Sequence, residues 1–332
     1  MKARKFSGGE VLGEGAHGKA INAGCGPTGE SFCKLIHKKI IKEVVLYTDR
    51  GEIVLYSDDI PEFLEFVNSI KNSIAKVFKP TGKPAVLQAK LDEEIAINRT
   101  ISSLYGPFAE TFTTIAPIAG FRDHKIYGVR VQLKGETLYA IFGSKCKSKY
   151  RLEMQECIVN ILLSLSLLNE KGYYHNDIKF DNIVKCDGIY KLIDWGAAIP
   201  IDFKIQKHGT LLGTSPIRWF LMGFNQTLSS IIISNKTYFG KYHVYKSPYF
   251  KTTNKRIQEE FFEIMAENLS PVMLFERFKH SFDVFMLGIM ILHGVIEHDL
   301  DWTTYKPFVD AFTSLKKPIG ARAALDVIAS KI

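Results

Sequence analysis

The spacing of hydrophobic and polar residues differs between the two parts of the chain. In the first third, short apolar runs are separated by turn residues. Residues 43–47 and 52–56 flank Asp49-Arg50-Gly51, which predicts a β-hairpin. Further strands are predicted at 31–36, 115–121 and 126–133, and apolar residues at helical spacing predict helices at 61–70 and 86–104. We therefore expect a first part that is rich in strands.

Helical spacing dominates the remainder of the chain. Residues 152–171 have one apolar face and are followed by Gly172, a typical helix C-cap. The most apolar stretch, 282–296, contains Asp283 and is shorter than the roughly 20 residues of a membrane-spanning helix, so we expect a helix buried in a protein core. A strand-rich start before a helix-rich remainder predicts an α+β protein with two lobes, at 1–134 and 135–332.

The composition is that of an ordinary globular protein. Of 332 residues, 46% are hydrophobic and 23% are charged, and the length predicts about two domains. The net charge of +8 suits anionic partners but selects none of them, and neither nucleic acid nor a membrane span is indicated. The five cysteines are scattered without a C-x-x-C pair, which argues against a metal or disulfide framework and favours a reducing, intracellular setting.

One short segment carries residue types that suit phosphoryl transfer. It contains Asp177, Lys179 and Asn182, and Asp194 follows in Asp-Trp-Gly. This chemistry needs a carboxylate that accepts a hydroxyl proton, a lysine beside the phosphoryl group, and an Asn and an Asp that hold Mg²⁺. Predicted strands at 183–185 and 189–193 would bring all four residues together in one hairpin. The alternative is a polar loop that only joins a helix to a hairpin, and the Asp-Trp-Gly argues against it.

A glycine-rich turn lies near the start of the chain. It reads Leu12-Gly13-Glu14-Gly15-Ala16-His17-Gly18, and glycines allow a backbone to approach phosphates closely. The turn is predicted to open a hairpin rather than a helix, which argues against a dinucleotide-binding fold. An ordinary turn without a ligand is the alternative interpretation.

These motifs, in this order, resemble the eukaryotic-type Ser/Thr protein kinase superfamily. His175-Asn176-Asp177-Ile178-Lys179 with Asn182 resembles its catalytic loop, and Asp194-Trp195-Gly196 resembles its Asp-Phe-Gly. Residues 281–288 resemble the central helix of its large lobe, whose aspartate, here Asp283, holds the backbone of the catalytic loop. The resemblance implies a bilobal protein-kinase-like fold that transfers the γ-phosphate of ATP to Ser/Thr hydroxyls of protein substrates.

The resemblance also implies roles for individual residues. Asp177 and Lys179 would be catalytic, and Asn182 and Asp194 would bind Mg²⁺, with Mn²⁺ as the alternative metal. The glycine-rich turn would cover the phosphates of ATP between the lobes. Lys34 would contact the α- and β-phosphates and pair with Glu94 on the helix predicted at 86–104. Positions on solvated surfaces are the alternative for both residues.

The chain departs from the family in several places. Asn176 replaces the arginine that reads a phosphate on the activation loop, and Trp195 is shared with the casein kinase II catalytic subunit, so we expect activity without activation-loop phosphorylation. The motif His-Asn-Asp-Ile-Lys also resembles kinases of large DNA viruses of insects, which would place the protein in host cytoplasm or a virion. Two inserts are expected, at about 42–84 and 222–280. The first would dock on the small lobe or bind a partner, and the sequence does not identify a partner for either insert.

Two other functions fit part of the pattern. A small-molecule phosphotransferase resembling aminoglycoside and choline kinases would share H-x-D, a downstream Asn and an Ile-Asp-Trp-like metal site. The glycine-rich turn, Lys179 and the helix at 281–288 favour protein substrates instead. A pseudokinase scaffold would bind nucleotide or partners without catalysis, and the presence of every chemical residue argues against it.

Overall fold

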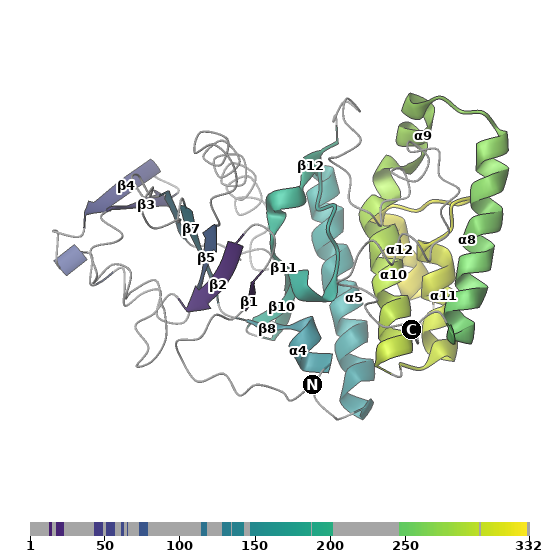
Figure 1. Ribbon diagram of the computed structural model, residues 1–332, viewed down its shortest axis with the longest axis horizontal. Coiled ribbons are helices and arrows are strands. Elements are labelled where there is room, and N and C mark those ends of the chain that lie inside the picture. The colour runs from purple at the N-terminus through teal and green to yellow at the C-terminus, as the bar shows by residue number, and fades with distance from the viewer. Residues whose placement is uncertain are drawn as a thin grey trace. The chain divides into compact units, whose positions relative to one another are not determined.

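The computed structural model is of the α+β class expected from the sequence, with helices and small antiparallel sheets. It describes residues 13–14, 18–22, 43–48, 51–56, 61–62, 65, 73–78, 114–117, 128–133, 135–142, 147–186, 188–201, 246–298 and 300–330. The chain divides into two compact units, Met1–Gly135 and Glu136–Ile332 (Figure 1). The boundary predicted between 134 and 135 lies next to this division.

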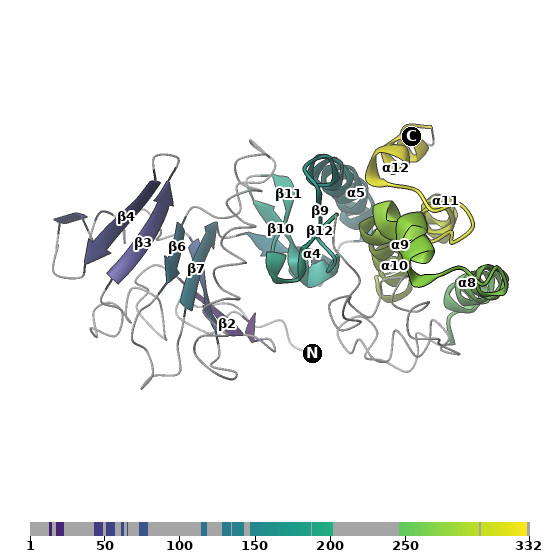
Figure 2. The ribbon, with the colours of Figure 1, turned by 90° about the horizontal axis from the view of Figure 1, so that it is seen from above.

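The first unit is built on an antiparallel sheet of five strands in the order β1-β2-β5-β7-β6. The strands are β1 (Gly13–Glu14), β2 (Gly18–Asn22), β5 (Ser73–Phe78), β6 (Thr114–Pro117) and β7 (Gly128–Leu133). A separate hairpin is formed by β3 (Glu43–Thr48) and β4 (Gly51–Tyr56), as predicted. Figure 2 shows β3 beside β6.

Strand β5 was not predicted from the sequence. It lies within the segment 42–84 that the sequence assigns to an insert, yet it pairs with β2 on one side and with β7 on the other. Residues 73–78 are therefore an integral part of the five-stranded sheet. Of the predicted helix at 61–70, residues 61, 62 and 65 are described and are helical. The elements predicted at 31–36 and 86–104 lie outside the described residues.

The second unit combines two small sheets with a group of helices. Its sheets have the orders β11-β10-β8 and β12-β9. The strands are β8 (Glu136–Thr137), β9 (Tyr173–Tyr174), β10 (Ile183–Cys186), β11 (Ile189–Leu192) and β12 (Ile199–Pro200). The main helices are α4 (Leu138–Phe142), α5 (Lys147–Glu170), α8 (Pro248–Ala266), α9 (Pro271–Phe278), α10 (Phe282–Glu297), α11 (Trp302–Phe312) and α12 (Ala321–Ala329).

Two local predictions for this unit are confirmed. Helix α5 ends at Glu170, and Gly172 follows with φ of 87°, a left-handed backbone that glycine adopts without steric cost. The hairpin predicted around Gly188 is present, because β10 and β11 pair with Ile183 opposite Leu192.

Helix α10 is the centre of the second unit. Its residues from Phe282 to Val295 are all buried, and it contacts α5, α8, α11 and α12. At Gly288 a Cβ atom would lie 2.6 Å from Cγ2 of Thr313, so the absence of a side chain lets α10 approach the end of α11. Among the described residues, the helical run Val272–Glu297 is long and apolar enough to cross a membrane, but 83% of the apolar window is buried. A helix buried in a protein core meets the same criteria of length and apolarity, and the sequence predicts such a helix at 282–296.

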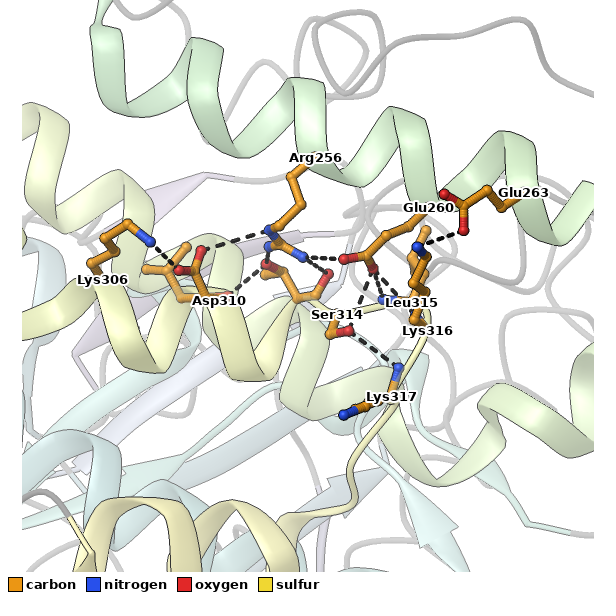
Figure 3. A network of polar contacts seen from close by, with 11 residues as sticks. Arg256, Glu260, Glu263, Lys306, Asp310, Ser314, Leu315, Lys316 and Lys317 are labelled. Carbon is orange, nitrogen blue, oxygen red and sulfur yellow. Dashed lines mark hydrogen bonds and ion pairs between the residues drawn. The ribbon is translucent and has the colours of Figure 1, made fainter.

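Helix α8 lies in the segment 222–280 that the sequence assigns to an insert, and it is tied firmly to the second unit (Figure 3). Arg256 Nη1 donates to Glu260 Oε1 at 2.9 Å, and Arg256 Nη2 donates to Thr313 Oγ1 at 2.5 Å. Glu260 Oε2 accepts from the main-chain N–H groups of Leu315 at 2.5 Å and Lys316 at 3.2 Å. These bonds join α8 to the connection between α11 and α12, so α8 is an integral helix of this unit.

Candidate functional site

The loop between β9 and β10 brings three of the predicted site residues together. Oδ2 of Asp177 accepts a hydrogen bond from Lys179 Nζ at 2.6 Å and another from Asn182 Nδ2 at 2.8 Å. The side chains of Asp177 and Lys179 are 14% and 21% exposed, so solutes can reach this ion pair. Within the described part of the chain, no residue donates to the other carboxylate oxygen, Oδ1. The cluster therefore presents an oriented carboxylate oxygen beside an ammonium group.

Asn182 is oriented by two hydrogen bonds from the same atom. It ends the single-turn helix η3 (Phe180–Asn182) and is buried. Its Nδ2 donates to Asp177 Oδ2 and also to the main-chain oxygen of Asp177, at 2.9 Å. Because both partners are acceptors, the amide nitrogen of Asn182 must face Asp177, and the amide oxygen does not take part in these two hydrogen bonds.

Asp194 is placed by the β10–β11 hairpin. Strand β10 begins directly after Asn182, and β11 ends two residues before Asp194. The main-chain N–H of Ile193 donates to the oxygen of Asn182 at 2.9 Å, which extends the ladder beyond the strands. Asn182 and Asp194 thus flank the open end of one hairpin. Asp194 has a left-handed backbone, with φ of 66°, a conformation in which Asp is enriched.

A buried aspartate holds the loop in place. The two carboxylate oxygens of Asp283 accept hydrogen bonds from the main-chain N–H groups of His175 at 2.8 Å and Asn176 at 2.7 Å. Asp283 lies in the first turn of α10, where the helix dipole favours a negative charge. Burial raises the pKa of the Asp283 carboxyl. The anchoring role predicted for Asp283 is confirmed.

His175 links the loop to the segment around Asp194. Its Nδ1 accepts the main-chain N–H of Asp177 at 3.3 Å, so Nε2 carries the proton that it donates to the oxygen of Ile193 at 3.0 Å. The ring centroid lies 4.5 Å from that of Trp195. His175 is fully buried, and burial lowers its pKa, which keeps the imidazole neutral. The histidine is therefore a structural link between the two segments.

The oxygen atoms around this loop suit a hard divalent cation. Within the described ranges, no three His, Cys, Asp or Glu residues gather closely enough to hold a metal by themselves. A magnesium site for phosphoryl transfer does not need such a cage, because one or two carboxylates and the phosphates of the substrate complete it. The amide oxygen of Asn182 and the carboxylate of Asp194 are donors of the type that Mg²⁺ prefers.

The phosphate-binding residues predicted in the first unit are described only in part. Gly13 and Glu14 form β1, Gly18 begins β2, and Gly13 is paired with Ala20, so the predicted hairpin around the glycine-rich turn is present. The other predicted residues of the first unit, Leu12, Gly15, Ala16, His17, Lys34 and Glu94, lie outside the described residues.

The structure also draws attention to a lysine that the sequence analysis missed. Lys76 lies on β5, the strand that pairs directly with β2, and it is opposite Ala20 in the register. Two apolar residues, Ile74 and Ala75, precede it, as in the Val-Ala-Ile-Lys motif of protein kinases. This short match is the sequence signal for Lys76, and it lies within the segment 42–84 that the sequence assigns to an insert.

A scan against models of protein families finds no match for the chain, and a search of curated proteins finds none.

Proposed function

We propose that this protein is an ATP-dependent Ser/Thr protein kinase with a bilobal kinase fold. One observation carries the proposal: Asp177, Lys179 and Asn182 are joined by hydrogen bonds in a loop whose backbone is held by the buried Asp283. Phosphoryl transfer depends mainly on positioning and on stabilisation of charge, and a rigid loop of this composition supplies both.

Asp177 would orient the attacking hydroxyl and accept its proton. Its Oδ2 is occupied by Lys179 and Asn182, so Oδ1 is the oxygen available for a substrate. The two donors fix the carboxylate in one orientation, which removes part of the entropic cost of reaching the transition state. Lys179 would also stabilise the negative charge on the transferred phosphoryl group, since its ammonium lies beside the same carboxylate.

Asn182 and Asp194 would hold Mg²⁺ or Mn²⁺, which neutralises charge on the phosphates of ATP when bound. The protein's own contribution is to fix these two residues relative to Asp177. It does so through the hydrogen bond between Ile193 and Asn182 and through the contacts of His175 with both segments. The base and the metal ligands therefore belong to one rigid assembly.

In the first unit, the glycine-rich hairpin Gly13–Gly18 would bind the phosphates of ATP. The lysine that contacts the α- and β-phosphates, with Glu94 as its partner, would be either Lys34 or Lys76. The hydrogen-bonded pairing of β5 with β2 favours Lys76, because it puts Lys76 on the strand that lies next to the glycine-rich hairpin in the sheet.

The test of this function is a transfer assay with γ-labelled ATP and three acceptors: a basic protein, a small aminoglycoside or amino alcohol, and water. We expect label on Ser and Thr of the protein, with Mg²⁺ or Mn²⁺ required. Transfer only to the small acceptor would identify a small-molecule phosphotransferase. Nucleotide binding without transfer to any acceptor would identify a scaffold and reject the proposal.

A further inference from the structure

Asn176 directly precedes Asp177, at the position where the kinase family has an arginine. The residue is fully buried, and its backbone is left-handed, with φ of 62°. Its main-chain N–H donates to Asp283, and its side-chain Nδ2 donates to the main-chain oxygen of Ala197 at 3.1 Å. One residue thus contacts α10 through its backbone and the segment after Asp194 through its side chain.

The chemistry of this position selects asparagine. A left-handed backbone is tolerated by glycine, asparagine and aspartate far better than by most residues. A donor is needed for the oxygen of Ala197, which excludes glycine and an ionised aspartate. A charged side chain at a fully buried position would also lose its hydration. Among the residues that tolerate this backbone, asparagine is the one that is neutral and also donates.

The hydrogen bond to Ala197 is one of two hydrogen bonds, called ties below, that hold the chain on either side of Asp194. On one side, His175 Nε2 donates to the oxygen of Ile193, the residue before Asp194. On the other side, Asn176 donates to Ala197, the last residue of the single-turn helix η4 (Trp195–Ala197). Both ties start from the two residues that precede Asp177. The spacing between Asp177 and Asp194 is therefore held from both sides of Asp194.

We propose that Asn176 is a positioning residue that fixes the spacing between Asp177 and Asp194; this inference rests on the proposed function. The amide of Asn176 and the main-chain carbonyl of Ala197 join the loop before Asp177 to the segment after Asp194. Loss of this contact should leave the fold intact but let Asp194 move relative to Asp177.

The test uses two variants that keep the backbone conformation accessible. Asn176→Asp keeps the size of the side chain but replaces the donor with an acceptor, and Asn176→Gly removes the side chain. Asn268 provides the matched control, since it is exposed, has φ of 54°, and also donates Nδ2 to a carbonyl, that of Ala266. Asn268→Asp and Asn268→Gly repeat the same changes outside the site.

Two measurements are made on all variants. Hydrogen exchange of the peptide covering 193–198 should accelerate by about tenfold in both Asn176 variants, because a local tie is lost while the fold is kept. The kcat for transfer should fall by about tenfold or more with a smaller change in KM for ATP, because a shift of ~1 Å in a catalytic group costs up to about 100-fold. Both Asn268 controls should match the wild type in both measurements.

The outcomes separate this inference from the proposed function. Wild-type exchange and kcat in Asn176→Asp would overturn the positioning role, and this variant decides the test if Asn176→Gly does not fold. Faster exchange in a protein that transfers no phosphate would support the tie and reject the kinase.

Discussion

Individual side chains in the site each serve one geometric purpose. Asp283 accepts hydrogen bonds from two backbone N–H groups and fixes the loop. His175 accepts one hydrogen bond from the N–H of Asp177 and donates one to the oxygen of Ile193, which connects the loop to the segment around Asp194. The imidazole can do this only in its neutral form with the proton on Nε2, because a protonated ring has no acceptor for the N–H of Asp177. The protonation state of His175 is therefore linked to the stability of the site.

This linkage predicts a pH dependence of stability. Burial lowers the pKa of His175, so below about pH 6.5 the unfolded chain binds a proton at this residue that the folded chain does not. The free energy of unfolding should fall as the pH drops from about 7.5 to 5.5, with a contribution of at most about 1.4 kcal/mol per pH unit from this group. Asp283, whose pKa is raised by burial, acts in the opposite direction, because its carboxylate binds a proton more readily in the folded chain than in the unfolded chain.

The measurement is urea unfolding of the wild type and of His175→Gln across this pH range. The variant should lose part of the slope, since glutamine does not titrate. His280→Gln is the comparison for a histidine outside the loop. Burial lowers the pKa of His280 too, so this variant should also lose part of the slope, and the two losses should add in the double variant. Equal slopes in the wild type and His175→Gln would show that His175 is not the group responsible.

The helices and strands that the sequence predicts correctly are those whose signals lie within a few consecutive residues. The β3–β4 and β10–β11 hairpins follow from turn residues between apolar runs, and the close approach of Asp177 and Asn182 follows from the few residues between them. Strand β5 has no strict alternation of apolar and polar residues, so its pairing with β2 and β7 decides its conformation. The tie from Asn176 could not be predicted, because its partner is a main-chain oxygen distant in sequence.

Helix α8 gives an element-scale prediction. Glu260→Ala removes the acceptor of Arg256 and of two main-chain N–H groups after α11. Leaving these donors unsatisfied should lower the free energy of unfolding by about 2–3 kcal/mol. Glu259→Ala is the matched control, since its carboxylate is 62% exposed and lies 3.8 Å from Lys255. A pair of this kind contributes at most about 1 kcal/mol. Equal effects of the two substitutions in urea unfolding would contradict the bracing role of α8.

For the molecule as a whole, the proposed reaction would use residues of both compact units. The second unit would supply Asp177 and Asp194, which lie in one short stretch of sequence, and the first would supply the glycine-rich hairpin and a lysine. The sequence predicts Lys34 as this lysine. Lys76 becomes a candidate only through the pairing of β5 with β2, which joins segments distant in sequence.

A pair of substitutions distinguishes Lys76 from Lys34 as the phosphate-binding lysine. Lys76→Ala should weaken transfer, raising KM for ATP and lowering kcat/KM by about 100-fold, because a charge that positions the phosphates is removed. Lys34→Ala serves as the comparison and should retain most of the activity. The reverse result would return the role to Lys34. Circular dichroism of both variants would exclude loss of the fold as the cause.

In the proposed reaction, the Asp177 carboxylate accepts the proton of the attacking hydroxyl. The most direct measurement is single-turnover transfer from γ-labelled ATP by the wild type, by Asp177→Asn and by Asp326→Asn, an exposed control on α12. ATP binding, followed by thermal shift with Mg²⁺, should be unchanged in all three, while Asp177→Asn should lose about 100-fold or more in rate, the contribution expected of a general base. Transfer by Asp177→Asn at the wild-type rate would show that the Asp177 carboxylate is not the proton acceptor.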